Sequence, residues 1–395
     1  MIIGAGHNQV AYIERAKALG LFTVALDGNP HAPGFAVAHA GEVANIRDAE
    51  AVTGAAQKFR VDAIYPSAEV GVEATAAAAS RLSLPGVSLE TARKVRHKGA
   101  MRQAVESAGI AANPPFKVVS DLSEALDWAV NVGFPVVVKP ADGQGSRSVV
   151  RVDTKDQLRP AFTNALDASY RREVVIEQFM EGESVSVEAL VFNEEVLPVA
   201  ITGRIMSRLP HRFNLGIYMP ANLSADESAA AKKFTAQCLQ AVGFTSGSTH
   251  TEVMLTKDGF KLVEMAGRLG GARIPTGLVP LAYGVDLGTE SIKVCLGERP
   301  DVRHRYARGA ALLWLIPPAG RLMRMPDLDE AKAIPGVEEV VWNINKGEDV
   351  PRAIDCISRD RIGYVIASGP TVIKAIAIAK VAGRMIEERL QIAIS

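Results

Sequence analysis

Short apolar runs alternate with amphipathic helical patterns in the first part of the chain. They predict strands at residues 1–4, 22–27 and 63–65 and helices at residues 9–19, 49–59 and 70–81. Strands that alternate with helices of this length indicate a parallel sheet with helices on its faces. We therefore expect a Rossmann-like domain over residues 1–93.

The next region begins with one helix, or two helices separated by a break, over residues 88–108. Beyond Pro114 and Pro115, the pattern predicts strands at 116–119, 134–140, 148–152 and 173–178 and helices at 121–132 and 155–166. This compact α+β unit has the size of a small lid. We expect the lid at about residues 114–181, inside a central domain of residues 94–300.

The remaining pattern predicts further mixed structure. Strands at 184–192 and 195–202 form a hairpin, a long loop passes through Pro210 and Pro220, and helices follow at 224–242 and 285–296. From Arg308, short strands in ALLWLI, EVVWNI and GYVIASG precede a helix over residues 372–390. We expect a C-terminal α+β domain over residues 301–395, and an α/β (α+β) class for the whole chain.

The composition excludes several classes of protein. With 48% hydrophobic and 22% charged residues, the chain is an ordinary globular one. The 44 basic and 44 acidic residues give zero net charge, which argues against a nucleic-acid partner. Three scattered cysteines favour a reducing compartment over a disulfide framework. No apolar run approaches the ~18 residues of a membrane span, and no export signal is evident. We expect a cytoplasmic protein that binds neither nucleic acid nor membrane.

Two glutamates flank a predicted turn in the segment HTEVMLTKDGFKLVEMA. If residues 257–259 form a three-residue hairpin loop, Thr256 faces Phe260 and Glu252 faces Glu264. Their Cβ atoms then lie roughly 5 Å apart, and carboxylates so close need a proton or a cation between them. Mg²⁺ takes one or two protein carboxylates together with water and phosphate oxygens, so both are candidate ligands. The alternative is a solvated hairpin with two outward glutamates.

Two lysines lie where phosphates could bind. Lys139 ends an apolar strand directly before the glycine-rich loop at 141–148, which includes Ser146. Glycines let backbone N–H groups approach phosphate oxygens, and the lysine adds a point charge. The loop is no Walker A motif, because the lysine precedes the glycines. Lys98 lies on a helix upstream, and exposed surface lysines are the alternative at both positions.

The strand VVIEQFM ends in Glu177, Gln178, Phe179 and Met180. An adenine ring needs an apolar slot with one backbone donor and one backbone acceptor along its edge, and a strand that leads into a linker offers these. Glu177 or Glu183 could then bond to the adenine amino group or to the ribose hydroxyls. The alternative is an edge strand with a salt-bridged glutamate.

Taken in this order, the segments resemble the ATP-grasp superfamily over almost the whole chain. The family pattern ends in two acidic metal ligands with an arginine downstream, here Arg268. The forms THTE and ExAxRxGG look most like the L-amino acid ligase branch, which joins two amino acids into a dipeptide, and so does the C-terminal region. Ala266 stands where related enzymes have a metal-binding Asn, and His97 stands where an Asp commonly precedes the first lysine.

The resemblance implies an ATP-grasp fold and an ATP-dependent carboxylate–amine ligase that acts on amino acids. The γ-phosphate would pass to one substrate's carboxylate, and an amine would attack the resulting acylphosphate. Mg²⁺, or Mn²⁺, on Glu252 and Glu264 would gather the phosphates of ATP, together with Lys98 and Lys139. Arg268 would hold the carboxylate, a role suited to a planar fork of donors.

Two further sets of residues are expected at the site. Backbone N–H groups of Gly270, Gly271 and Arg273 could contact the substrate, with a plain turn as the alternative. His250 shares a strand face with Glu252 and could deprotonate the amine, with a structural or substrate-contact histidine as the alternative.

The long loop with Arg204, Arg208, His211 and Arg212 is expected to cover the site, because reactive acylphosphates must be shielded from water. The alternative is a solvated basic loop. A homodimer is expected, since this is the commonest soluble assembly.

Three other functions compete with this prediction. A purine-pathway ATP-grasp enzyme would activate formate or bicarbonate for a ribonucleotide amine. A nicotinamide-dependent dehydrogenase would use GAGHNQ as its cofactor loop, but that loop lacks the third glycine of the dinucleotide fingerprint. A non-catalytic nucleotide sensor would have no need of both lysines and both glutamates.

Overall fold

The N-terminal region forms a parallel sheet, as the alternating pattern predicts. The computed structural model describes residues 1–207, 213–325 and 327–393. The first sheet has the order β3-β2-β1-β4 and consists of β1 (Ile2–Ile3), β2 (Val24–Asp27), β3 (Ala40–Val43) and β4 (Tyr65–Pro66). Its helical elements are α1 (His7–Ala18), α2 (Gly34–Val37), α3 (Ala49–Lys58), the 3₁₀ turn η1 (Glu69–Gly71) and α4 (Val72–Arg81).

Two short helices lead from this sheet into the lid. They are α5 (Leu89–Arg96) and α6 (Lys98–Ser107), and the predicted break falls at His97. The His97 side chain caps α6 by accepting a hydrogen bond from the backbone N–H of Ala100. Because Ser88 caps α5 in the same way, each helix begins at a defined residue.

The lid contains the four strands and two helices that the sequence predicts, and its strands form an antiparallel sheet in the order β5-β8-β6-β7. Its elements are β5 (Phe116–Val119), α7 (Leu122–Val132), β6 (Val136–Pro140), β7 (Val150–Val152), α8 (Lys155–Ala168) and β8 (Val174–Gln178). The turn between β6 and β7 holds the glycine-rich loop, so Lys139 lies at the end of β6.

An eight-stranded antiparallel sheet in the order β13-β12-β9-β10-β11-β14-β18-β16 forms the centre of the molecule. Its strands are β9 (Glu183–Phe192), β10 (Glu195–Met206), β11 (Asn214–Met219), β12 (Gly247–Thr256), β13 (Gly259–Ala266), β14 (Gly309–Trp314), β16 (Val337–Trp342) and β18 (Gly363–Gly369). The helical elements in this part of the chain are α9 (Ala225–Ala241), the π-helix η2 (Ile274–Leu278), α10 (Val279–Tyr283) and α11 (Leu287–Cys295).

The C-terminal region adds a small sheet and three helices. The sheet has the order β17-β15-β19 and consists of β15 (Gly320–Arg324), β17 (Asp349–Val350) and β19 (Gln391–Ala393). The helices are α12 (Leu328–Lys332), α13 (Cys356–Asp360) and α14 (Val372–Glu388). Ala375, Ala379 and Ala382 of α14 are fully buried, because small side chains let the helix lie close to the sheet.

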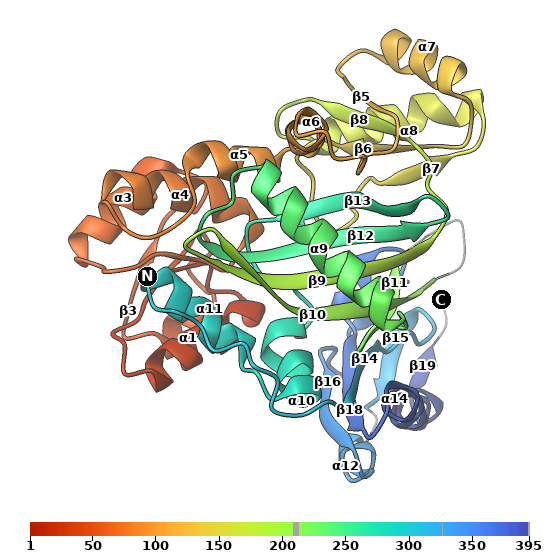
Figure 1. Cartoon of the computed structure of the whole chain (residues 1–395). Coiled ribbons are helices and arrows are strands. Elements are labelled where there is room, and N and C mark those ends of the chain that lie inside the picture. The colour runs from red at the N-terminus through yellow and green to blue at the C-terminus, as the bar shows by residue number, and fades with distance from the viewer. Residues whose placement is uncertain (208–212, 326, 394–395) are drawn as a thin grey trace.

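Figure 1 shows how these parts surround one region of the large sheet. The lid lies over β12 and β13, the N-terminal helices lie to one side, and the C-terminal elements lie at the far end of the sheet. The sheet itself continues past the domain boundary predicted at residue 300, since β11 pairs with β14. The predicted boundaries therefore stay predictions, while the mixed α/β class and the architecture are confirmed.

The prediction of a long loop after residue 202 is partly wrong. The strand predicted to end at residue 202 continues as β10 to Met206, and β11 pairs with β10 and β14 where a loop was expected. The segment NLGIYM alternates in strand fashion, and Pro220 follows the strand without interrupting it. In the described residues, no helix combines the length and the apolar character needed to cross a membrane.

Candidate active site

Glu252 and Glu264 pair across β12 and β13, as the sequence predicts. The turn differs from the prediction, because Thr256 pairs with Gly259 and the loop contains two residues. Val263 is an extra residue in β13, and this bulge produces the predicted pairing of the glutamates. Gly259 has a positive φ of 92°, as expected.

Both glutamates line a cavity of about 380 Å³ between the lid, the large sheet and the C-terminal region. A cavity of this size is typical of small-molecule sites. The predicted site residues that line it are Lys98, Lys139, Ser146, Glu177, Phe179, Met180, His250, Glu252, Glu264, Arg268 and Gly271. Gln178, Glu183, Gly270 and Arg273 do not line it, and the side chains of Gln178 and Glu183 are exposed elsewhere.

Each glutamate of the pair contacts a basic side chain. Lys98 Nζ lies 2.8 Å from Glu264 Oε1. Arg204 contacts both oxygens of Glu252, with Nη2 2.7 Å from Oε1 and Nη1 2.9 Å from Oε2. Burial alone would raise the pKa of Glu252, but the Arg204 guanidinium holds it well below its usual range. Two ion pairs therefore offset the expected repulsion between the carboxylates.

The donor set fits a magnesium ion that arrives with a nucleotide. The described part of the chain holds no group of three or more His, Cys, Asp or Glu side chains placed around a common metal position. Mg²⁺ needs only one or two protein carboxylates when phosphates and water complete its octahedron. Glu252 and Glu264 would supply these carboxylates, whereas Ala266 has no side-chain oxygen to offer. The metal role of the two glutamates stays a prediction.

Lys139 belongs to a buried ion triad. Its Nζ lies 2.6 Å from Glu177 Oε1, and Nη2 of Arg102 lies 2.6 Å from Glu177 Oε2. All three side chains are at most 5% exposed. Both Glu177 oxygens are thus engaged within the protein, so the geometry favours a role in holding Lys139 over the predicted adenine contact. Arg102 was missed, although it lies four residues after Lys98 and therefore on the same face of α6.

Replacing Arg102 with Met is expected to cost about 3–5 kcal/mol of unfolding free energy, because the mutation removes one partner of a buried ion pair. Urea unfolding followed by circular dichroism measures the loss. Arg299→Met is the control, since Arg299 and its partner Glu195 are 62% and 50% exposed, and little change is expected there. Equal losses in the two variants would contradict the importance of the buried triad.

Burial lowers the pKa of Lys139 to about 8, even though Glu177 favours its charged form. The side-chain amine of Lys139 attracts phosphate only in its protonated, charged form. We therefore expect the affinity for ADP to fall by up to about tenfold as the pH rises from 7 to 9. Isothermal titration calorimetry measures this slope. The guanidinium of a Lys139→Arg variant stays charged over this pH range. If ADP affinity depended on pH in the same way in that variant, Lys139 would not be the group whose charge binds the phosphates.

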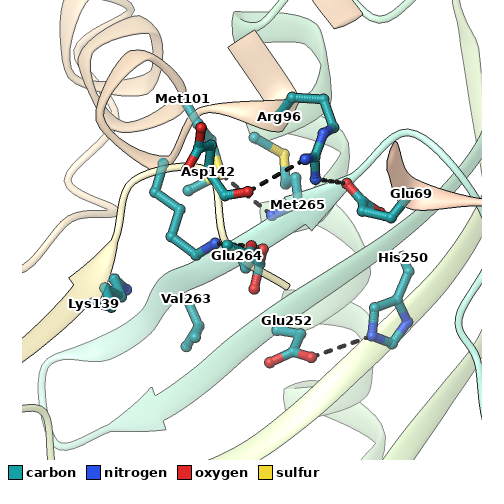
Figure 2. A network of polar contacts seen from close by, with 12 residues as sticks. Glu69, Arg96, Met101, Lys139, Asp142, His250, Glu252, Val263, Glu264 and Met265 are labelled. Carbon is teal, nitrogen blue, oxygen red and sulfur yellow. Dashed lines mark hydrogen bonds and ion pairs between the residues drawn. The ribbon is translucent and has the colours of Figure 1, made fainter. Parts of the chain in front are cut away.

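Arg268 is oriented by a glutamate of the N-terminal region. Its Nε lies 2.8 Å from Glu69 Oε2, and its Nη1 donates to the carbonyl of Leu269 at 2.7 Å. Arg96 holds the other oxygen of Glu69 at 2.7 Å and donates to the backbone carbonyl of Asp142 at the base of the glycine-rich loop. Figure 2 shows Arg96 between Glu69 and Asp142. Glu69 lines the cavity and was missed, because nothing near it in the sequence indicates this partner.

His250 is held between two carboxylates. Its Nδ1 contacts Glu188, and its Nε2 lies 3.4 Å from Glu252 Oε1, a contact drawn in Figure 2. Burial alone lowers the pKa of the imidazole, but the two carboxylates raise it to about 9. Because carboxylates contact both ring nitrogens, the geometry favours the structural alternative, and the general-base role stays a prediction.

The loop after β13 contributes less than expected. The backbone N–H of Gly270 donates to Glu188 Oε2 at 2.8 Å and is therefore used within the protein. Arg273 pairs with Glu339 at 3.0 Å, away from the cavity. Only Gly271 of the three predicted residues lines the cavity.

The C-terminal region forms one wall of the cavity, through residues that the sequence did not identify. Trp314, Cys356, Arg359 and Asp360 line it. The Arg359 guanidinium lies 3.4 Å from the centroid of the Trp314 ring, and its Nε donates to Asp360 at 2.9 Å. Of the predicted covering loop, Arg204 lies in β10 and lines the cavity, while Arg208, His211 and Arg212 lie outside the described residues.

Two protein families match parts of the chain. The ATP-grasp domain matches residues 132–276, and the L-amino acid ligase C-terminal domain 2 matches residues 313–391. An uncharacterised protein of Sinorhizobium fredii, y4rH, is 30% identical over 375 residues, which cover 92% of this chain and 77% of that protein.

Solved structures of low sequence identity share the fold. The L-amino acid ligase from Bacillus licheniformis superposes with a TM-score of 0.85 at 22% identity, over 100% of this chain and 98% of that one. Phosphoribosylglycinamide synthetase from Anaerococcus prevotii superposes with a TM-score of 0.78 at 20% identity, over 100% and 98%. The chain therefore belongs to the ATP-grasp superfamily, and its C-terminal region is similar to the C-terminal domain of L-amino acid ligases.

Proposed function

We propose that the protein is an ATP-dependent ligase that joins two amino acids into a dipeptide and releases ADP and phosphate. The observation that carries this proposal is the convergence of two lysines, two facing glutamates and Arg268 on one cavity. The lysines and the glutamates suit a nucleotide with its metal, and the arginine suits a carboxylate beside the transferred phosphate.

The chemistry runs in two steps. A carboxylate oxygen held by Arg268 attacks the γ-phosphorus of ATP, and the bond to the β-phosphate oxygen breaks to release ADP. The amine nitrogen of the second substrate then attacks the acyl carbon, and phosphate leaves as the amine proton passes to solvent. Lys98 and Lys139 neutralise phosphate charge in the first step. This phosphoryl transfer requires no covalent bond to the protein.

Glu252 and Glu264 are the residues that would hold Mg²⁺, or Mn²⁺ in its place. When bound, the ion supplies charge neutralisation and orientation of the phosphates. The adenine ring is assigned to the slot beside Phe179 and Met180, and Ser146 to the phosphate loop. A cytoplasmic homodimer completes the proposal, as the sequence composition and the usual symmetry of soluble assemblies suggest.

The C-terminal wall supports the dipeptide proposal over a purine-pathway enzyme. That wall belongs to the region matched by the L-amino acid ligase C-terminal domain, and it contributes Trp314, Arg359 and Asp360 to the cavity. A purine-pathway relative would need a phosphate pocket for its ribonucleotide.

Single-turnover phosphate release tests the proposal with mixtures of amino acids. We expect ADP formation that depends on a pair of amino acids, with the dipeptide detected by mass spectrometry. Parallel reactions contain glycinamide ribonucleotide with formate, or aminoimidazole ribonucleotide with bicarbonate. ADP formation only in those reactions would replace the dipeptide proposal with the purine-pathway function.

A further inference from the structure

Arg204 occupies the position at Glu252 that a bound cation would need. Its guanidinium contacts both oxygens of the carboxylate and also donates to the hydroxyl of Ser186. The side chain is only 10% exposed, and its partner Glu252 is 25% exposed. This is a fork-shaped, charge-assisted pair in a partly dry site, which is the strong form of such a contact.

The facing glutamate is neutralised in a similar but weaker way. Lys98 contacts one oxygen of Glu264 and also donates a hydrogen bond to the backbone carbonyl of Gly143 in the glycine-rich loop. A lysine offers a point charge, so it leaves the second oxygen of Glu264 without an ionic partner in the described contacts. Of the two pairs, the one with Arg204 is therefore the harder to displace.

A divalent ion and Arg204 compete for the same two oxygens. Mg²⁺ loses its hydration water reluctantly and normally keeps several waters. Binding to two carboxylates alone therefore provides too little free energy to displace a buried guanidinium from Glu252. A nucleotide changes this balance, because its phosphates ligate the ion and also accept the displaced guanidinium.

We propose that Arg204 is an internal counter-ion that stands in for the metal at Glu252, so that a divalent cation enters the site only together with nucleotide. This inference rests on the proposed metal role of Glu252 and Glu264. It makes Arg204 a positioning residue, which holds the carboxylate in place before the substrate complex forms.

Equilibrium dialysis of Mn²⁺ tests the inference without any amino-acid substrate. The wild-type protein is expected to retain Mn²⁺ when ADP is present and to retain almost none when ADP is absent. Arg204→Met is expected to bind Mn²⁺ without ADP at least about tenfold more tightly than the wild type, because Glu252 then keeps only the 3.4 Å contact of His250 with one of its oxygens. A second change, Glu252→Gln in the Arg204→Met background, should remove the gained binding.

Lys139→Met is the matched control. It removes a cation from the same cavity, but Lys139 contacts Glu177 and neither glutamate of the pair. An equal gain of Mn²⁺ binding in this variant would show a general charge effect and overturn the inference. If Arg204→Met fails to fold, Arg204→Lys replaces it, since a lysine cannot hold both oxygens at once, and a smaller gain is expected there.

Two further outcomes separate this inference from the function beneath it. If the wild-type protein binds Mn²⁺ equally well with and without ADP, the counter-ion role is wrong while the metal site stands. If neither the wild type nor any variant retains Mn²⁺ even with ADP, the metal role of the glutamates fails. Melting temperatures give an independent reading, because Mn²⁺ alone should stabilise Arg204→Met and leave the wild type unchanged.

Discussion

Glu264→Gln is expected to abolish ADP formation, with a loss of at least about a hundredfold in the single-turnover rate. The amide has the shape of the carboxylate but not its charge, so the site would keep only one of two anionic metal ligands. The mutation also deprives Lys98 of its ionic partner at 2.8 Å. The rate is measured as ADP released with a mixture of amino acids, and circular dichroism checks the fold.

Glu195→Gln is the matched control for this prediction. Glu195 lies at the start of β10, on the same large sheet, and its exposed side chain pairs with Arg299 outside the cavity. We expect an unchanged rate for the control. Unchanged turnover in Glu264→Gln would remove the metal assignment, whereas a loss of helical signal would show a structural role instead.

The sequence predicted those features that depend on local pattern. The alternation of strands and helices in the first region, the lid with Lys139 at the end of its strand, and the pairing of Glu252 with Glu264 are all confirmed. The first two follow from periodicity within a short window, where side-chain direction is fixed by the backbone, whereas the glutamates pair because the bulge at Val263 offsets the shorter turn. The β-bulge at Val263 escaped prediction, because one unpaired residue leaves no clear mark on the pattern.

The sequence could not predict contacts between distant segments. Arg102 and Glu177 are 75 residues apart, and Glu69 reaches Arg268 from another region of the fold. Such pairs depend on how the sheets pack, and a lone arginine or glutamate is ordinarily a solvated residue. For the same reason Arg204 was assigned to a covering loop, although it lies in β10 with its head group on Glu252.

Four of the ion pairs in the described part of the cavity join a lysine or an arginine to a glutamate, and these four are of two kinds. The pairs are Lys98–Glu264, Arg204–Glu252, Lys139–Glu177 and Arg268–Glu69. In the last two pairs, a second arginine also contacts the glutamate: Arg102 contacts Glu177, and Arg96 contacts Glu69. Each of these glutamates therefore keeps an ionic partner within the protein when its first partner moves. This second arginine distinguishes Glu177 and Glu69 from Glu252 and Glu264, for which the metal role is predicted.

Arg268→Lys is expected to lower kcat/KM for the carboxylate substrate by about a hundredfold to a thousandfold. A lysine keeps the charge, but it cannot present two parallel donors to a carboxylate and to the phosphate that forms on it. The affinity for ADP should change little, since the phosphates of ADP are assigned to Lys98 and Lys139. Initial rates over a range of amino-acid concentrations, with calorimetry for ADP, measure the two effects separately.

The comparison of these two measurements decides what Arg268 binds. A loss confined to the carboxylate supports the acylphosphate mechanism, whereas an equal loss of ADP affinity would make Arg268 a nucleotide ligand. Arg303→Lys is the control, because Arg303 is 89% exposed and pairs only with Asp301 in the described contacts. Glu69→Gln gives the complementary result: loosening the Nε contact should weaken carboxylate use less than Arg268→Lys does, because the fork itself remains.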